Sequence, residues 1–206
     1  MIKPTPPKWL VDSLDEEFLP APEIGGFIKE HLLNENSKLF NPEHLHLRHA
    51  KIGYLWTNTQ NVRQMRQVAA MVEIPKPPTQ SSAWFKARYR YQLRKWFGTD
   101  KLDYLMTFDA GYMFDCEDIN RVATIDHECY HCAQKRDEFG GLKFNNKTGL
   151  PVFGLQGHDV EEFVGIIRRY GAGGGAGETK AFVAAAQLEP EIGLADIEKI
   201  CGNCVR

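Results

Sequence analysis

The stretch from residue 127 to residue 131 reads His-Glu-Cys-Tyr-His, which is the pattern H-E-x-x-H. On an α-helix, residues four apart lie on the same face, one turn apart, so His127 and His131 can direct two imidazole rings toward one metal ion. Glu128 lies one residue further round the helix, where its carboxylate can hold a water on that metal and take its proton. Zinc-dependent peptidases use this arrangement, and the motif therefore predicts a helix that carries a metal site.

The residues around the motif favour a helix inside the fold. No proline or glycine occurs between residues 117 and 139, and Asp115 or Asp118 can cap the start of the helix. The spacings of three and four residues predict a buried stripe made of Val122, Ile125, Cys129 and Cys132. Both histidines fall on the adjacent face, where small or polar neighbours leave room for an ion.

A catalytic zinc ion takes three protein ligands and leaves one position open, so a third ligand has to come from another part of the chain. His158 is the strongest candidate, because it stands at the expected start of a second helix that extends to about residue 170. Glu161 and Glu162 are alternatives, since a carboxylate on that helix can also complete a zinc site. The acidic residues Asp159, Glu161 and Glu162 can instead orient a ligating imidazole or offset the helix dipole.

The motif resembles that of the phage metallopeptidase family when it is read together with two later segments. Residues 157–163 read Gly-His-Asp-Val-Glu-Glu-Phe, and residues 169–171 read Arg-Tyr-Gly. That family is in turn similar to SprT-like and other minimal zincins, and the resemblance covers the chain from about residue 44 to the C-terminus. It implies a phage or prophage origin and a zincin core. The functional residues that it implies are the acid/base Glu128 and the zinc ligands His127, His131 and His158.

Five cysteines and the lack of an apolar leader favour reduced thiols in a cytoplasm, the host cytoplasm if a phage encodes the chain. SprT-like proteins often add a zinc ribbon with two C-x-x-C pairs, for which this chain has no clear equivalent. Cys129 and Cys132 lie on the predicted motif helix, where they pack as small apolar residues. Cys201 and Cys204 have a glycine-asparagine turn between them, and they can bind a second metal, form a labile disulfide or simply pack.

Length and composition predict one globular domain with short appendages. Of the 206 residues, 43% are hydrophobic and 25% are charged, which is ordinary for such a domain. The net charge of −2 creates no global field for nucleic acid or an anionic membrane, and no apolar run is long enough to cross a bilayer. We expect a lead-in with a short helix (1–40), a zincin-like domain (41–170), and a glycine-rich hinge with a helical tail (171–206).

The expected fold class is α+β, with a small mixed or antiparallel sheet packed on the motif helix and further helices beside it. Hydrophobic patterns predict strands at residues 44–56, 68–74 and 103–113, a helix at 82–97 and a hairpin at 142–153. His44 and His46 share one face of the first strand, where we expect exposed side chains rather than a second metal site. An edge strand beside the motif helix can hold an extended peptide through main-chain hydrogen bonds.

The sequence thus predicts a zinc metallopeptidase that acts on a peptide or protein and has no membrane partner. The alternative is a zinc-stabilised phage protein that binds a host or nucleic-acid partner with little proteolysis. Nucleic acid is the less favoured partner, and it rests on the basic residues Lys86, Arg88, Arg90, Arg94 and Lys95. A solvated helix face above a buried aromatic stripe explains these residues more simply.

Overall fold

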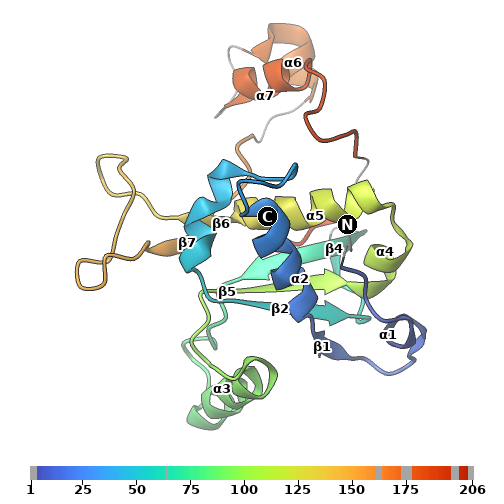
Figure 1. Cartoon of the computed structure of the whole chain (residues 1–206), viewed down its shortest axis with the longest axis vertical. Coiled ribbons are helices and arrows are strands. Elements are labelled where there is room, and N and C mark those ends of the chain that lie inside the picture. Colours follow the sequence, from blue (N-terminus) through green and yellow to red (C-terminus); the bar gives the residue numbers. More distant parts are fainter. Residues whose placement is uncertain (1–3, 64, 161–163, 173–177, 196–199, 204–206) are drawn as a thin grey trace. The chain divides into compact units, whose positions relative to one another are not determined.

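The computed structural model describes residues 4–63, 65–160, 164–172, 178–195 and 200–203 (Figure 1). They belong to two compact units, one formed by residues 1–156 with 195–206 and the other by residues 157–194. The helices of the first unit are α1 (Lys8–Asp12), α2 (Pro22–Phe27), the π-helical turn η1 (Ile28–Leu32), the 3₁₀-helix η2 (Pro42–His49), α3 (Ala83–Phe97), α4 (Ala110–Asp115) and α5 (Asp118–His131).

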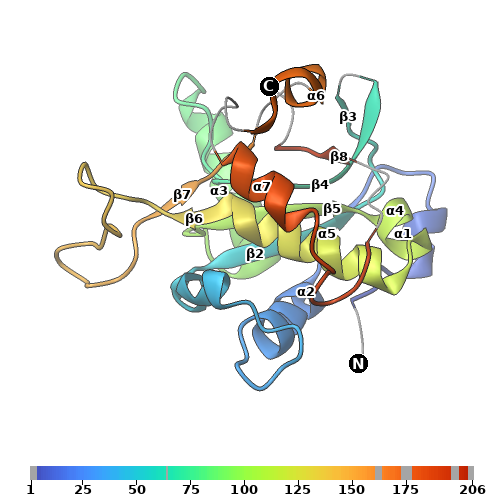
Figure 2. The ribbon, with the colours of Figure 1, turned by 90° about the horizontal axis from the view of Figure 1, so that it is seen from above.

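Six strands of the first unit form a mixed sheet within the described residues, in the order β1-β2-β5-β4-β3 with β8 beside β4 (Figure 2). They are β1 (Phe18–Pro20), β2 (Ile52–Thr57), β3 (Val62–Arg63), β4 (Arg66–Glu73), β5 (Tyr104–Asp109) and β8 (Ile200–Cys201). β2 runs parallel to β5, whereas β4 runs antiparallel to it. On its other side, β4 pairs with the short β3 and then, in parallel, with β8.

Alternate residues of the central strands face two separate cores. Trp56 and Phe108 point into the larger core, which α1, α2 and α5 complete. Leu55, the residue before Trp56, and Leu105, three residues before Phe108, point the other way and pack with Leu93 of α3. Side chains alternate between the faces of a strand, so this pattern places α5 and α3 on opposite faces of the sheet (Figure 1).

Several predicted elements are confirmed, and two strands are shorter than predicted. β2, β4 and α3 occupy the positions expected for two strands and a helix. Residues 42–49 form η2 instead of a strand, because Pro42 occupies the first turn and the Asn41 side chain caps it. The strand predicted at residues 103–113 is β5, which ends at Asp109. The Oδ1 atom of Asp109 accepts the N–H of Tyr112 at 2.7 Å and so caps the start of α4.

The start of α5 is held by an arginine and not by the predicted aspartate caps. Glu117 is the N-cap residue, and no side-chain cap bond forms there, so the prediction of Asp115 or Asp118 as the cap is wrong. The buried Arg121 donates instead to the carbonyl oxygen of Met113 at 2.7 Å. It therefore satisfies the end of α4 and fixes where α5 begins.

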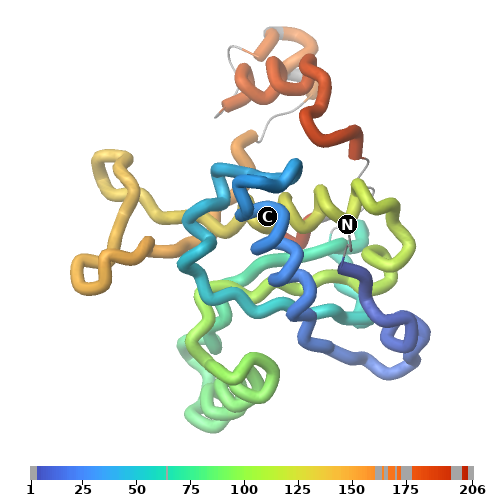
Figure 3. Tube along the Cα trace, in the orientation of Figure 1, coloured from blue at the N-terminus to red at the C-terminus, as the bar shows by residue number. Residues whose placement is uncertain are grey.

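The motif helix is also shorter than the pattern suggested, because it ends at His131. Cys132 is its C-cap and opens strand β6 (Cys132–Gln134), so this cysteine is buried as predicted but is not helical. β6 pairs antiparallel with β7 (Phe153–Leu155), and residues 135–152 form the arm that joins them (Figure 3). The hairpin predicted at residues 142–153 makes up the second half of this arm and the start of β7. The Tyr104 hydroxyl lies 2.9 Å from main-chain carbonyls of both strands and anchors the arm beside the end of α5.

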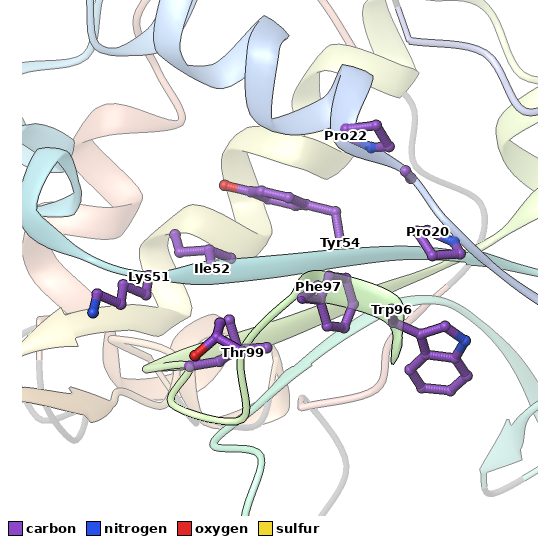
Figure 4. A pocket seen from close by; sticks show the side chains of 10 residues that line it. Pro20, Pro22, Lys51, Ile52, Tyr54, Trp96, Phe97 and Thr99 are labelled. Atoms are coloured by element: carbon purple, nitrogen blue, oxygen red, sulfur yellow. The ribbon is translucent and has the colours of Figure 1, made fainter. Parts of the chain in front are cut away.

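A mostly apolar cavity of about 500 Å³ lies between β2 and the C-terminal end of α3. Its walls include the rings of Tyr54, Trp96 and Phe97 (Figure 4). Neither motif histidine lines it, so it is separate from the metal site that the sequence predicts.

The second unit contains α6 (Val164–Tyr170) and α7 (Thr179–Ala185). The helix predicted from His158 is described only from Val164, and His158 itself lies in an irregular segment. Glu161 and Glu162 lie outside the described residues, as do residues 173–177 of the predicted hinge. Among the helices that the structure describes, none has the length and apolar character needed to cross a bilayer.

Candidate metal centre

His127 and His131 lie one turn apart at the C-terminal end of α5, and their Nε2 atoms are 3.2 Å apart. The two rings meet at an angle of 71°, so their edges converge instead of stacking. Zinc–nitrogen bonds of about 2.0–2.1 Å place two nitrogens of a tetrahedral site about 3.3 Å apart. The helix therefore brings the two predicted ligands to a separation that one zinc ion can span.

The His131 ring is oriented by the main chain of Gln156. Its Nδ1 lies 2.7 Å from the Gln156 carbonyl oxygen. A carbonyl oxygen only accepts, so Nδ1 carries the proton and Nε2 presents its lone pair toward the site. The N–H of Gln156 donates in return to the carbonyl oxygen of His131 at 3.0 Å, which fixes the end of the helix as well as the ring.

A thiol from the C-terminal strand joins the two histidines. The Sγ atom of Cys201 lies 3.2 Å from His131 Nε2, and the ligand atoms of His127, His131 and Cys201 lie within 4.8 Å of one another. Cys201 is paired with Ala70 of β4, whose side chain faces the core beneath α5, and paired residues point to the same face. Two imidazoles and a thiolate form a donor set that suits zinc rather than magnesium or calcium.

No pattern in the sequence indicates that Cys201 lies beside the motif. The sequence left open whether Cys201 and Cys204 bind a second metal, form a labile disulfide or simply pack, and Cys204 lies outside the described residues. The meeting of Cys201 with His131 depends on the pairing of β8 with β4, which are far apart in the chain. Only a residue contact between these distant strands would have revealed it.

Glu128 is completely buried between the helix and β4. Among the described residues, neither of its carboxylate oxygens makes a hydrogen bond of normal geometry. Burial raises the pKa of Glu128 to about 7, and the nearby Cys201 thiol and Val72 main chain lower it by smaller amounts. Val72 already donates its N–H to Asn203 at 2.8 Å, so its contact with Glu128 is secondary. Buried carboxylates of this kind occur at sites that handle protons.

Two histidines of η2 support α5 from the side. His44 is buried, and its Nε2 lies 2.7 Å from Oδ1 of Asp126, the residue before the motif. His46 Nε2 donates to the carbonyl oxygen of Cys132 at 2.6 Å. The prediction of exposed strand positions is therefore wrong for both, because η2 turns the two rings toward the helix. The prediction placed no metal at these residues, and each has a partner on or beside α5.

The sequence analysis also proposed His158, Asp159, Glu161 and Glu162 for this site. His158 and Asp159 belong to the second unit and are exposed, in an irregular segment. The predicted alternatives Glu161 and Glu162 lie outside the described residues. The third-ligand role of His158 is thus a proposal.

A mixed sheet with the motif helix packed on one face is a zincin-like α+β fold, and the His/Cys cluster beside a buried glutamate is a candidate metal site of that fold class. The family model described as "Putative phage metallopeptidase" matches residues 25–187, and the chain belongs to this family. The family implies a metal cofactor and a peptide or protein substrate. No curated protein and no solved structure is significantly similar to the chain.

Proposed function

We propose that this protein is a zinc-dependent peptidase in which Glu128 is the general base and acid. His127, His131 and His158 are the proposed zinc ligands. The observation that carries the proposal is the position of Glu128. Its buried carboxylate, without a normal hydrogen bond among the described residues, stands beside two imidazole nitrogens that converge to 3.2 Å.

The chemistry divides between the ion and the side chains. Zinc, when bound, supplies a Lewis acid that polarises the scissile carbonyl and lowers the pKa of water toward neutrality. Glu128 takes the proton from the attacking water and passes it to the departing amine. The pKa of about 7 that burial gives to Glu128 suits a group that accepts and returns a proton near neutral pH.

Chain connectivity supports His158 as the third ligand. Gln156 is fixed to His131 by two hydrogen bonds, and His158 follows two residues later. Consecutive Cα atoms are about 3.8 Å apart, so the Cα atoms of Gln156 and His158 are separated by no more than about 7.6 Å. This short connection favours His158 over Glu161 and Glu162, which are further along the chain. Asp159 is the residue next to His158, and its proposed role is to support that ligand.

The substrate is proposed to bind as an extended peptide along the edge of β4. Ala70 and Val72 lie on this edge, on the strand that packs against α5. Their outward main-chain groups are paired by residues 202 and 203 and not by a neighbouring long strand. Such an edge holds a peptide through main-chain hydrogen bonds, with its scissile bond beside the motif.

One observation favours a second candidate, the zinc-stabilised binding module with little proteolysis. Structural zinc sites are closed by four protein ligands, and Cys201 offers a ligand in addition to the three histidines.

The Cys201 thiol also bears on the location of the protein in the cell. We propose the host cytoplasm, where thiols stay reduced, for either function.

The proposal is tested by Glu128→Gln in the full-length protein, with Glu117→Gln as the matched control. Glu117 is an exposed residue at the start of the same helix. We expect about one zinc per chain in all three proteins by elemental mass spectrometry, because neither glutamate is a proposed ligand. Hydrolysis of fluorescently labelled casein is expected to fall about 10²- to 10⁴-fold in Glu128→Gln alone. Unchanged hydrolysis in that variant would remove Glu128 from the mechanism.

A further inference from the structure

We infer that Cys201 is itself a metal ligand, and that residues 200–203 form a built-in inhibitor segment lying on the substrate edge of the same site. The inhibitor half of this inference rests on the proposed peptidase function, whereas the ligand half does not. The family match ends at residue 187, so the segment lies outside the part of the chain that the family model covers.

The position of the thiol fits a shared ion. A tetrahedral zinc with bonds of about 2.3 Å to sulfur and about 2.0–2.1 Å to nitrogen places the two ligand atoms about 3.5 Å apart. Cys201 Sγ and His131 Nε2 are 3.2 Å apart, and the thiol is buried. Glu128 is an independent indication of a metal site here. Its fully buried carboxylate lies close to the Cys201 thiol and makes no hydrogen bond of normal geometry among the described residues.

The inhibitor segment pairs with β4 as a bound peptide would. The N–H of Gly202 donates to the carbonyl oxygen of Ala70 at 2.6 Å. The Asn203 side-chain amide then continues the ladder, since its Nδ2 donates to the Val72 carbonyl at 2.7 Å and its Oδ1 accepts the Val72 N–H at 2.8 Å. The side chain of Arg63, in β3, also donates to the Gly202 carbonyl. The edge that would bind substrate is therefore already paired.

The fit of the segment against β4 is close enough to require a glycine. A Cβ atom added at Gly202 would lie 2.7 Å from Cβ of Met71 and 3.0 Å from Cγ1 of Val68. The first separation is shorter than real Cβ contacts, and Met71 Cβ is fixed to its strand. Any side chain at residue 202 would thus push the segment away from β4.

Residues 200–203 combine two inhibitory effects, one on the metal site and one on the β4 edge. With three histidine ligands, a thiolate from Cys201 would be a fourth protein ligand and would close the site. Hydrolysis needs both an open coordination position and an unpaired β4 edge. Release of residues 200–203 would supply both at once. On release, the Cys201 thiolate would take a proton from solvent, and a water would occupy the ligand position that the thiolate leaves.

The ligand half is tested on the full-length protein loaded with Co²⁺ in place of zinc. A cysteine ligand gives a thiolate-to-cobalt charge-transfer absorption in the near ultraviolet. We expect this absorption in the wild type and in Cys116→Ser, and its loss in Cys201→Ser. Cys116 is a half-buried cysteine at the end of α4 and serves as the matched control. A wild type without the absorption, or a Cys201→Ser protein that retains it, would overturn the inference.

The inhibitor half is tested by hydrolysis of labelled casein with the zinc-loaded proteins. Cys201→Ser, Gly202→Ala and Asn203→Ala are each expected to exceed the wild type by about tenfold or more, because each weakens the closed state. The exposed Asn146→Ala on the hairpin arm is the control for Asn203→Ala and should leave the rate unchanged. Gly202→Ala and Asn203→Ala keep the thiol, so they answer the question even if Cys201→Ser does not fold.

The outcomes separate this inference from the proposed function. No increase in any of the three variants would overturn the inhibitor role, and loss of zinc from Cys201→Ser would make the thiol an essential ligand instead of an inhibitor. Hydrolysis that rises in Cys201→Ser and persists in Cys201→Ser/Glu128→Gln would contradict the proposed mechanism while supporting release. The cobalt absorption reports the thiol ligand in every case.

Discussion

His131 and Gln156 are joined by two hydrogen bonds that run in opposite directions. The ring Nδ1–H of His131 donates to the Gln156 carbonyl at 2.7 Å, and the Gln156 N–H donates to the His131 carbonyl at 3.0 Å. One residue ends the motif helix, and the other is the last residue of the first unit before the chain enters the second. The pair therefore fixes the orientation of the His131 ring and the position of Gln156, two residues before His158.

His127→Ala and His131→Ala should each weaken zinc binding severely. Loss of a partner that only orients a ligand costs about 10- to 100-fold in affinity, and loss of a ligand should cost more. His49→Ala is the matched control, since His49 is an exposed histidine at the end of η2. The measurement is zinc affinity by competition with a chromophoric chelator. Wild-type affinity in either motif variant would show that the motif does not bind the metal.

The metal-free protein should lose stability as the pH rises, because Glu128 is buried. Its pKa is near the ordinary value of 4.5 in the unfolded chain and about 7 in the fold. At low pH both states hold the proton. As the pH rises past 4.5 the unfolded state releases its proton first, so the free energy of unfolding falls. The loss reaches about 3 kcal/mol and is complete above about pH 8.

The contribution of Glu128 is isolated by urea unfolding of wild type and Glu128→Gln in the presence of a chelator. The free energy of unfolding of the variant, relative to the wild type, should increase by about 3 kcal/mol between about pH 4 and pH 8. The same comparison for Glu117→Gln should stay flat, because that side chain is exposed. A difference between wild type and Glu128→Gln that does not change with pH would contradict the burial argument.

His44→Ala should destabilise the fold without removing the metal. His44 is buried, and it is bonded to Asp126 and packed edge-on against Tyr130 with ring centroids 4.5 Å apart. Loss of a hydrogen bond to a charged group costs about 1.5–3 kcal/mol. Thermal unfolding should show this loss, whereas His49→Ala should unfold like the wild type. Loss of zinc from a His44→Ala protein that is still folded would instead make His44 part of the metal centre.

Local patterns predicted the elements that carry the motif, because helices and strands depend on short-range periodicity. The stripe of Val122, Ile125 and Cys129 is buried as expected. Apolar runs likewise located β2 and β4. The histidines at 44 and 46 were misplaced, since alternating apolar residues also occur in a 3₁₀-helix that a proline and an asparagine cap begin. There, local capping outweighed the alternation.

Long-range pairing could not be predicted in the same way. Cys201 reaches His131 only because β8 pairs with β4, and Asn203 reaches Val72 for the same reason. No periodicity in residues 200–204 specifies which strand edge they join. The hydrogen bond between the buried His44 and Asp126 is likewise a contact between distant segments. The sequence therefore predicted the local elements around the motif better than the contacts between distant segments.

Reversing the charge of α3 with Arg88→Glu/Arg90→Glu should leave both zinc content and casein hydrolysis unchanged. These arginines are exposed, and α3 packs through Leu93 on the face of the sheet opposite α5. The net charge of −2 gives no general attraction for nucleic acid, so we expect no salt-sensitive binding of single-stranded DNA by the wild type. Fluorescence anisotropy at low and high salt makes the measurement. Affinity that falls steeply with salt in the wild type, and is lost in the double variant, would identify α3 as a nucleic-acid surface.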